Sequence, residues 1–137
     1  MRKKIIAVIM TLTVFFSMAG IAGASLFSSE YIDDWYAYTQ VYENGRVRVN
    51  FDIRATGKMD VLGAKTVIIQ EQAPNSSSWT AVATLKSDNY PNMLGYNKSN
   101  HASEVSYYGG KAGYSYRAKV YFYAEKGGYD TKEFITY

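Results

Sequence analysis

The chain has 137 residues, no cysteine and one histidine, with 15 basic against 12 acidic side chains. Disulfides are therefore excluded, and so are structural zinc sites, which need cysteine or several histidines. Three of the basic residues, Arg2, Lys3 and Lys4, stand at the start, and without them 12 basic residues face 12 acidic ones. The remainder is neutral, which argues against nucleic acid as a partner.

The first 24 residues have the order of a secretory signal sequence. The basic start is followed by an uncharged apolar run from Ile5, which closes on the small residues Ala22-Gly23-Ala24. We therefore expect cleavage after Ala24 and a mature domain of residues 25–137 that is secreted or held at the cell surface. The alternative is an apolar run retained as a membrane anchor, since about 20 apolar residues span a bilayer. Export without any cysteine favours a bacterial protein that is not a lipoprotein.

Residues 46–54 alternate between polar and apolar side chains without an error, as in a half-buried strand. Asn44-Gly45, directly before them, predicts a two-residue hairpin turn. Directly opposed residues share a face of a sheet, so this turn also fixes the face of the preceding strand. The side chains that it directs to the core are Val47, Val49, Phe51 and Ile53, together with Tyr36, Tyr38 and Tyr42.

Five further strands are predicted at intervals of about ten residues. They cover residues 65–72, 79–85, 104–108, 114–125 and 129–137. Residues 86–103, rich in Asn and Gly, predict a long irregular loop. Seven short strands with turn residues between them predict an all-β fold, a two-sheet antiparallel sandwich, with a small β-barrel as the second choice.

The penultimate predicted strand resembles that of immunoglobulin-like and fibronectin type III-like domains, as in small exported proteins of Gram-positive bacteria. The resemblance lies in Gly110-Lys111-Ala112-Gly113-Tyr114-Ser115-Tyr116-Arg117-Ala118-Lys119-Val120. It implies that Tyr114 is the corner tyrosine, whose hydroxyl bonds back to the main chain. It also implies that Tyr116 takes a position that is cysteine in antibody domains. The likeness implies a fold and no chemistry.

No constellation of residues predicts catalysis, a metal site or a cofactor. The single histidine, His101, has Ser99 and Glu104 near it in sequence, yet we expect an exposed loop histidine rather than part of a hydrolytic triad. Asp33-Asp34 is expected to be a solvated lead-in rather than a calcium site. The chain is therefore expected to be non-enzymatic, with a hydrolase as the remote alternative.

Tyrosine is unusually frequent for a chain of this length, and all 14 tyrosines follow residue 24. Their rings can stack on sugars or anchor a partner protein. The predicted contacts are Tyr121, Tyr123 and Lys119 on the outward face of strand 114–125, and Tyr90 and Tyr96 in the long loop. The competing interpretation is that neighbouring segments cover these rings.

The expected function is a binding module for a polysaccharide, the cell wall or a protein. The alternative is a secreted effector of the bacteriocin-like kind. A membrane partner is expected only if the N-terminal segment is retained as an anchor.

Overall fold

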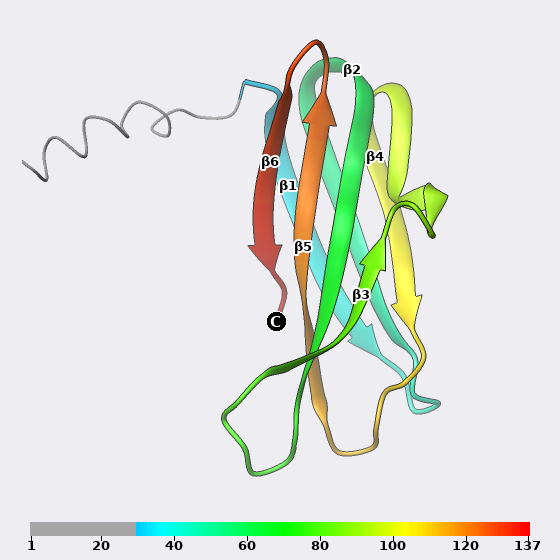
Figure 1. Ribbon diagram of the computed structural model, residues 1–137, viewed down its shortest axis with the longest axis vertical. Helices are drawn as coiled ribbons and strands as arrows, with labels where there is room; N and C mark the ends of the chain where they lie inside the picture. Colours follow the sequence, from blue (N-terminus) through cyan, green and yellow to red (C-terminus); the bar gives the residue numbers. More distant parts are fainter. Residues whose placement is uncertain (1–29) are drawn as a thin grey trace, which may run out of the picture. The chain divides into compact units, whose positions relative to one another are not determined.

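The computed structural model describes residues 30–137, which form six antiparallel strands and one short turn of 3-10 helix (Figure 1). The predicted signal sequence and its cleavage after Ala24 lie outside the described residues. Tyr31–Tyr137 form one compact unit. No helix in residues 30–137 is both long and apolar enough to span a membrane. The elements are β1 (Ile32–Val41), β2 (Val47–Gln72), β3 (Thr80–Lys86), η1 (Pro91–Met93), β4 (Leu94–Tyr107), β5 (Ser115–Glu125) and β6 (Tyr129–Ile135).

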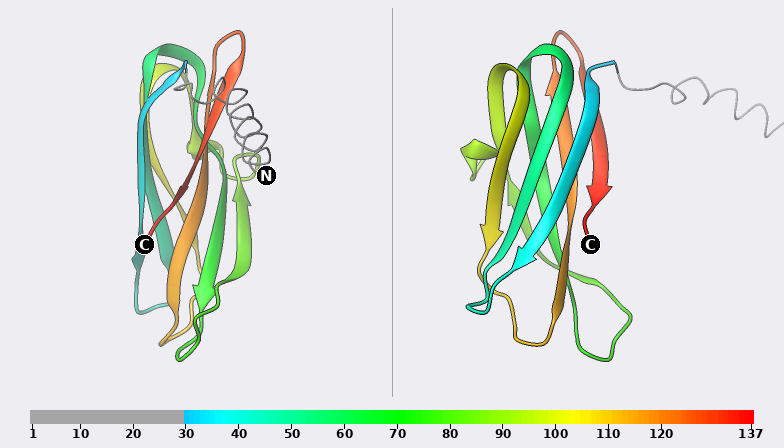
Figure 2. Two further views of the ribbon diagram at one scale, coloured as in Figure 1. Left: turned by 90° about the vertical axis from the view of Figure 1, so that its left-hand side faces the viewer. Right: turned by 180° about the vertical axis from the view of Figure 1, so that it is seen from behind.

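The strand β2 is 26 residues long and belongs to both layers of the fold. Its first half pairs with β1 and β4, and its second half pairs with β3 and β5, which in turn pairs with β6. At the crossing, residues 61–63 pair with β4 on one side and with β5 on the other. The register shifts between Arg54 and Met59 and between Ala64 and Thr66, where the strand crosses from one layer to the other. Figure 2 shows the layers edge-on, joined at one end by β2. We call β1, the first half of β2 and β4 the first layer, and the other strands the second layer.

The predicted all-β antiparallel fold is confirmed, with one strand fewer than expected. The segments 46–54 and 65–72, predicted as separate strands, are the two halves of β2. Gly63 lies at the crossing, where a Cβ would stand 2.9 Å from the Cα of Leu94. The missing side chain therefore lets the bent strand pass close to the start of β4. The relation to immunoglobulin-like domains stays a prediction.

The core lies between the layers. Phe51 of the first layer meets Phe122 of the second edge-to-face, with ring centroids 6.0 Å apart. The predicted inward set of 46–54 is buried, as are Tyr116, Ala118, Val120, Phe122 and Ala124 of β5. On one side the layers are also held together by Thr39 and Thr136, whose hydroxyls are 2.6 Å apart. Because Thr136 is buried, this contact closes the β1–β6 side of the core.

The predicted hairpin register is wrong by one residue. Val41 pairs with Val47, and the turn holds three residues, Glu43-Asn44-Gly45. The amide of Tyr42 donates to the carbonyl of Arg46 at 2.9 Å, and Gly45 takes a left-handed φ of +89°. A three-residue turn with glycine in that position is the common alternative to the two-residue turn. A shift of one residue reverses the faces of β1, so Tyr36 and Tyr38 point outward and Ala37 points to the core.

The long loop predicted for 86–103 is also wrong in its second part. Only residues 87–93 are irregular, and β4 begins at Leu94. The first half of β4 is an edge of the sheet that pairs with β2 only, and most of its side chains are exposed. Polar residues at an exposed edge hide the period of two that marks a half-buried strand.

Candidate functional site

Two tyrosines stand side by side on the outer face of the first layer. Tyr36 and Tyr38 of β1 are 56% and 43% exposed, and their ring centroids are 6.1 Å apart. Tyr36 also packs edge-to-face with Phe134, at 5.7 Å between centroids. Neither hydroxyl has a hydrogen-bond partner within residues 30–137, so both remain available to a ligand.

Two shallow cavities adjoin these rings, and they form what we call the tyrosine groove. One is about 220 Å³ and the other about 120 Å³, and Tyr36 and Asp52 line both. The larger also has Tyr38, Asn50 and Ala102 in its wall. Ala102 lies opposite Asp52 across the β2–β4 pair, and its small side chain leaves the floor of the groove open.

The groove offers hydrogen-bonding groups beside the rings. The exposed carboxylate of Asp52 has no ion-pair partner within the described residues. Arg54, by contrast, is held by Asp33 at 3.1 Å and Asp34 at 3.6 Å. Asn100, on β4, lines the smaller cavity. An unpaired carboxylate and an amide beside two tyrosine rings can accept and donate hydrogen bonds to a polar ligand that stacks on the rings.

The structure brings together Lys119, Tyr121 and Tyr123 on the outer face of the second layer, as the alternation predicted. All three are half-buried. The ring of Tyr123 has two close neighbours, because Lys65 Nζ lies 4.2 Å from its centroid and Tyr129 is stacked on it at 5.8 Å. Its hydroxyl donates to Glu125 at 2.6 Å, and this carboxylate, with burial, raises the pKa of Tyr123 to about 12. Tyr123 is therefore a packed ring rather than a free platform.

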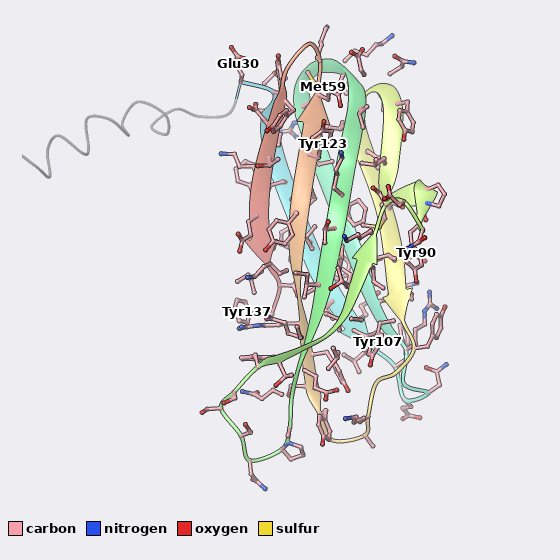
Figure 3. All side chains as sticks on the ribbon, in the orientation of Figure 1. Glu30, Met59, Tyr90, Tyr107, Tyr123 and Tyr137 are labelled. Carbon is pink, nitrogen blue, oxygen red and sulfur yellow. The ribbon has the colours of Figure 1, made fainter. Side chains whose placement is uncertain are left out.

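Tyr90 and Tyr96 lie apart from those residues and from each other. Tyr90 precedes η1 and lines an open cavity of about 250 Å³ with Asn92 and Tyr108. Tyr96 lies on β4 opposite Val61, at the corner of the fold, and does not line that cavity. Figure 3 shows Tyr90 beside η1, away from Tyr123 on β5. The structure thus does not join the predicted contacts into one site.

His101 is buried on β4, which corrects the prediction of an exposed loop histidine. It lies opposite Ile53, a core residue, so its ring faces inward toward Phe51. Lys98 Nζ is 3.2 Å from Nδ1, and an ammonium can only donate, so Nδ1 accepts and Nε2 donates to the carbonyl of Asn92 at 2.9 Å. Both ring nitrogens are occupied by these structural contacts. Within residues 30–137, no group of three acidic or histidine side chains could hold a metal ion.

Another cavity lies at the opposite end of the fold from the β2 crossing. It has about 380 Å³ between the 42–46 turn and residues 110–114, where Gly110 donates to the carbonyl of Gly45 at 2.8 Å. Lys111 lines it, but its ammonium is bound to Glu71 at 3.1 Å and lies over the ring of Tyr114. The one ammonium in the wall is thus already neutralised, and the cavity offers a ligand the carboxylate of Glu43, main-chain groups and tyrosine rings.

The tyrosine groove was not predicted from the sequence, because a two-residue turn at Asn44-Gly45 places Tyr36 and Tyr38 in the core. A signal was present: Asp34, Tyr36, Tyr38 and Gln40 alternate with smaller or apolar residues. Asp34 and Gln40 are polar and share one face of the strand with the two tyrosines, so the pattern favours the outward face for both tyrosines. This pattern conflicts with the face that a two-residue turn predicts for β1.

No protein-family model and no curated protein matches the chain. Among solved structures, a β-glucosidase, EmGH1 from Erythrobacter marinus, is similar at 12% sequence identity with a TM-score of 0.32. The similarity covers 76% of this chain and 15% of that enzyme. At this TM-score the likeness carries no argument about the function of this protein.

Proposed function

We propose that the protein is an exported, non-catalytic module that binds a neutral polysaccharide of the cell envelope through the tyrosine groove. The observation that carries the proposal is the pair of exposed rings, Tyr36 and Tyr38, beside the unpaired carboxylate of Asp52. Sugar rings have apolar faces that stack on tyrosine and a rim of hydroxyls that donate to carboxylates. The export rests on the predicted signal sequence.

The charge of the groove supports a neutral rather than an anionic chain. The single guanidinium of Arg54 is shared by Asp33 and Asp34, and Asp52 adds a third carboxylate, so the charge at the groove is net negative. A carboxylate or phosphate on the ligand would be repelled there. The groove is also shallow, as suits the side of a long chain rather than a small molecule that must be enclosed.

The test is binding of the full-length protein to purified cell wall and to insoluble neutral polysaccharides. Tyr36→Ala/Tyr38→Ala should weaken binding at least tenfold, because each ring contributes about 1 kcal/mol of stacking. Asp52→Ala should weaken it less. A circular dichroism melt checks that both variants fold.

The matched control is Tyr121→Ala/Tyr123→Ala, which removes two tyrosines from the other layer. We expect it to bind neutral polysaccharide as well as the unaltered protein does. Loss of binding in this variant alone would move the site to β5, and no binding by the unaltered protein would contradict the proposed function.

A further inference from the structure

Four cationic side chains gather on the outer face of the second layer, the face toward the viewer in Figure 1. Arg117 and Lys119 alternate along β5 and are therefore about 7 Å apart. Lys86 of β3 pairs with Thr66, which pairs on its other side with Tyr121. Lys65 directly precedes Thr66, at the bulge in β2. Its ammonium covers the ring of Tyr123, so it lies on the same face as the other three cations. We call these four residues the basic face.

The two layers differ in how their charges are compensated. On the first layer the arginines at 46 and 48 share Glu104, at 3.5 and 3.4 Å, and Arg54 is held by Asp33. On the basic face, the pair of Lys119 with Glu133, at 3.6 Å, is the one ion pair within the described residues. The neutral charge of residues 25–137 thus conceals a net positive surface on one side of the molecule, where these four cations outnumber the carboxylates of Glu125 and Glu133.

Aromatic rings lie among these cations. The Arg117 guanidinium lies 4.3 Å from the Trp79 ring centroid and 5.5 Å from that of Tyr137. Its Nε donates to Gln70 at 2.6 Å, which fixes the plane of the group on the sheet. Tyr137 and Tyr129 are 85% and 67% exposed. Cations alternating with exposed rings on a sheet surface suit a ligand that carries both negative charges and ring faces.

We propose that the basic face binds an anionic polysaccharide, with its acidic groups on Lys65, Lys86 and Lys119 and sugar rings against Tyr129 and Tyr137. Charge complementarity selects the ligand class, because the same polymer would meet the unpaired Asp52 carboxylate on the other layer. The extended sheet surface matches a chain, and the predicted export puts acidic glycans within reach. The site is distinct from the tyrosine groove, and the protein would hold one glycan on each layer.

The experiment measures the affinity of the full-length protein for polygalacturonate and for heparin at increasing salt, with dextran as the neutral reference. In Lys65→Gln/Lys86→Gln/Lys119→Gln, affinity at about 50 mM salt should fall at least tenfold, and its dependence on salt should become flatter. The matched control, Arg46→Gln/Arg48→Gln/Arg54→Gln, removes the same charge from the other layer and should keep the affinity. Thermal melts verify the fold of both.

Equal losses in the two triple variants would overturn the proposal, because net charge rather than the basic face would then decide binding. Salt-independent binding, or none, would overturn it as well. Tighter binding to single-stranded DNA or to phosphatidylglycerol vesicles than to either acidic glycan would assign the face to another class of partner. Tyr36→Ala/Tyr38→Ala should keep its affinity for polygalacturonate, which separates this proposal from the proposed function.

Discussion

Glu71 is the buried carboxylate of the second layer, and two partners satisfy it. Tyr116 donates its hydroxyl to Glu71 at 2.8 Å, and Lys111 Nζ donates at 3.1 Å. The same hydroxyl accepts from the backbone amide of Lys111 at 2.7 Å. Burial raises the pKa of Tyr116, while the hydrogen bond and charge of Glu71 raise the pKa of Lys111. Tyr116 therefore binds the loop before β5, through the amide of Lys111, and also binds Glu71 on β2.

We predict that Tyr116→Phe destabilises the protein by about 2 kcal/mol, since it removes a hydrogen bond to a buried charge and leaves a backbone amide unpaired. Tyr114→Phe is the matched control and should cost less than about 0.5 kcal/mol, because its hydroxyl has no partner within the described residues. Urea unfolding measures both. The immunoglobulin-like resemblance implies the opposite order, with the larger loss at Tyr114, so that outcome would contradict our assignment.

At the scale of elements, the crossing of β2 depends on Gly63. A Cβ at this position would collide with the carbonyl of Met93 and the Cα of Leu94, which are backbone atoms that cannot turn aside. We predict that Gly63→Ala costs about 3 kcal/mol in the free energy of unfolding. Gly57→Ala, on the same strand with nothing near its Cβ, should be neutral or slightly stabilising. Chemical denaturation of the two variants checks this, and equal effects would show that the crossing tolerates a side chain.

Alternation predicted the strands that have one buried and one outer face. β5 and the first half of β2 were assigned correctly, together with the faces of Val49, Phe51 and Phe122. Long-range pairing was beyond the sequence: the polar start of β4 is a strand only because β2 bends past it. His101 was misplaced for the same reason, because its burial follows from its partner Ile53.

A surface lined by tyrosine rings could be predicted from the sequence, but its position on the fold could not. An excess of tyrosine indicated a ring-lined surface, and two rings do line a groove. The face on which these rings lie depends on whether the Asn44-Gly45 turn has two or three residues. One additional residue in the turn shifts the register of β1 and moves its side chains to the opposite face. Both turns accept Asn-Gly, so the residues at the turn cannot distinguish them.

At the scale of the whole molecule, both layers depend on one strand. Each half of β2 has neighbours on both sides, so neither layer keeps its central strand if β2 detaches. Phe51 and Phe122 pack across the layers, and Thr39 and Thr136 join them at the side. A chain without cysteine is stabilised by such non-covalent contacts alone. Because the two layers share these contacts, we expect them to unfold together in one cooperative transition.

The two tryptophans report on different layers, which makes this cooperativity measurable. Trp35 lies on β1, and Trp79 lies before β3 over the Arg117 guanidinium. We predict that Trp35→Phe and Trp79→Phe, each with one remaining tryptophan, give urea midpoints by fluorescence that equal their own midpoints by circular dichroism. Each variant is its own control, so a change in stability from the substitution does not affect the comparison. If the Trp79 signal alone moved at lower urea, the β3 edge would unfold independently and β2 would not couple the layers.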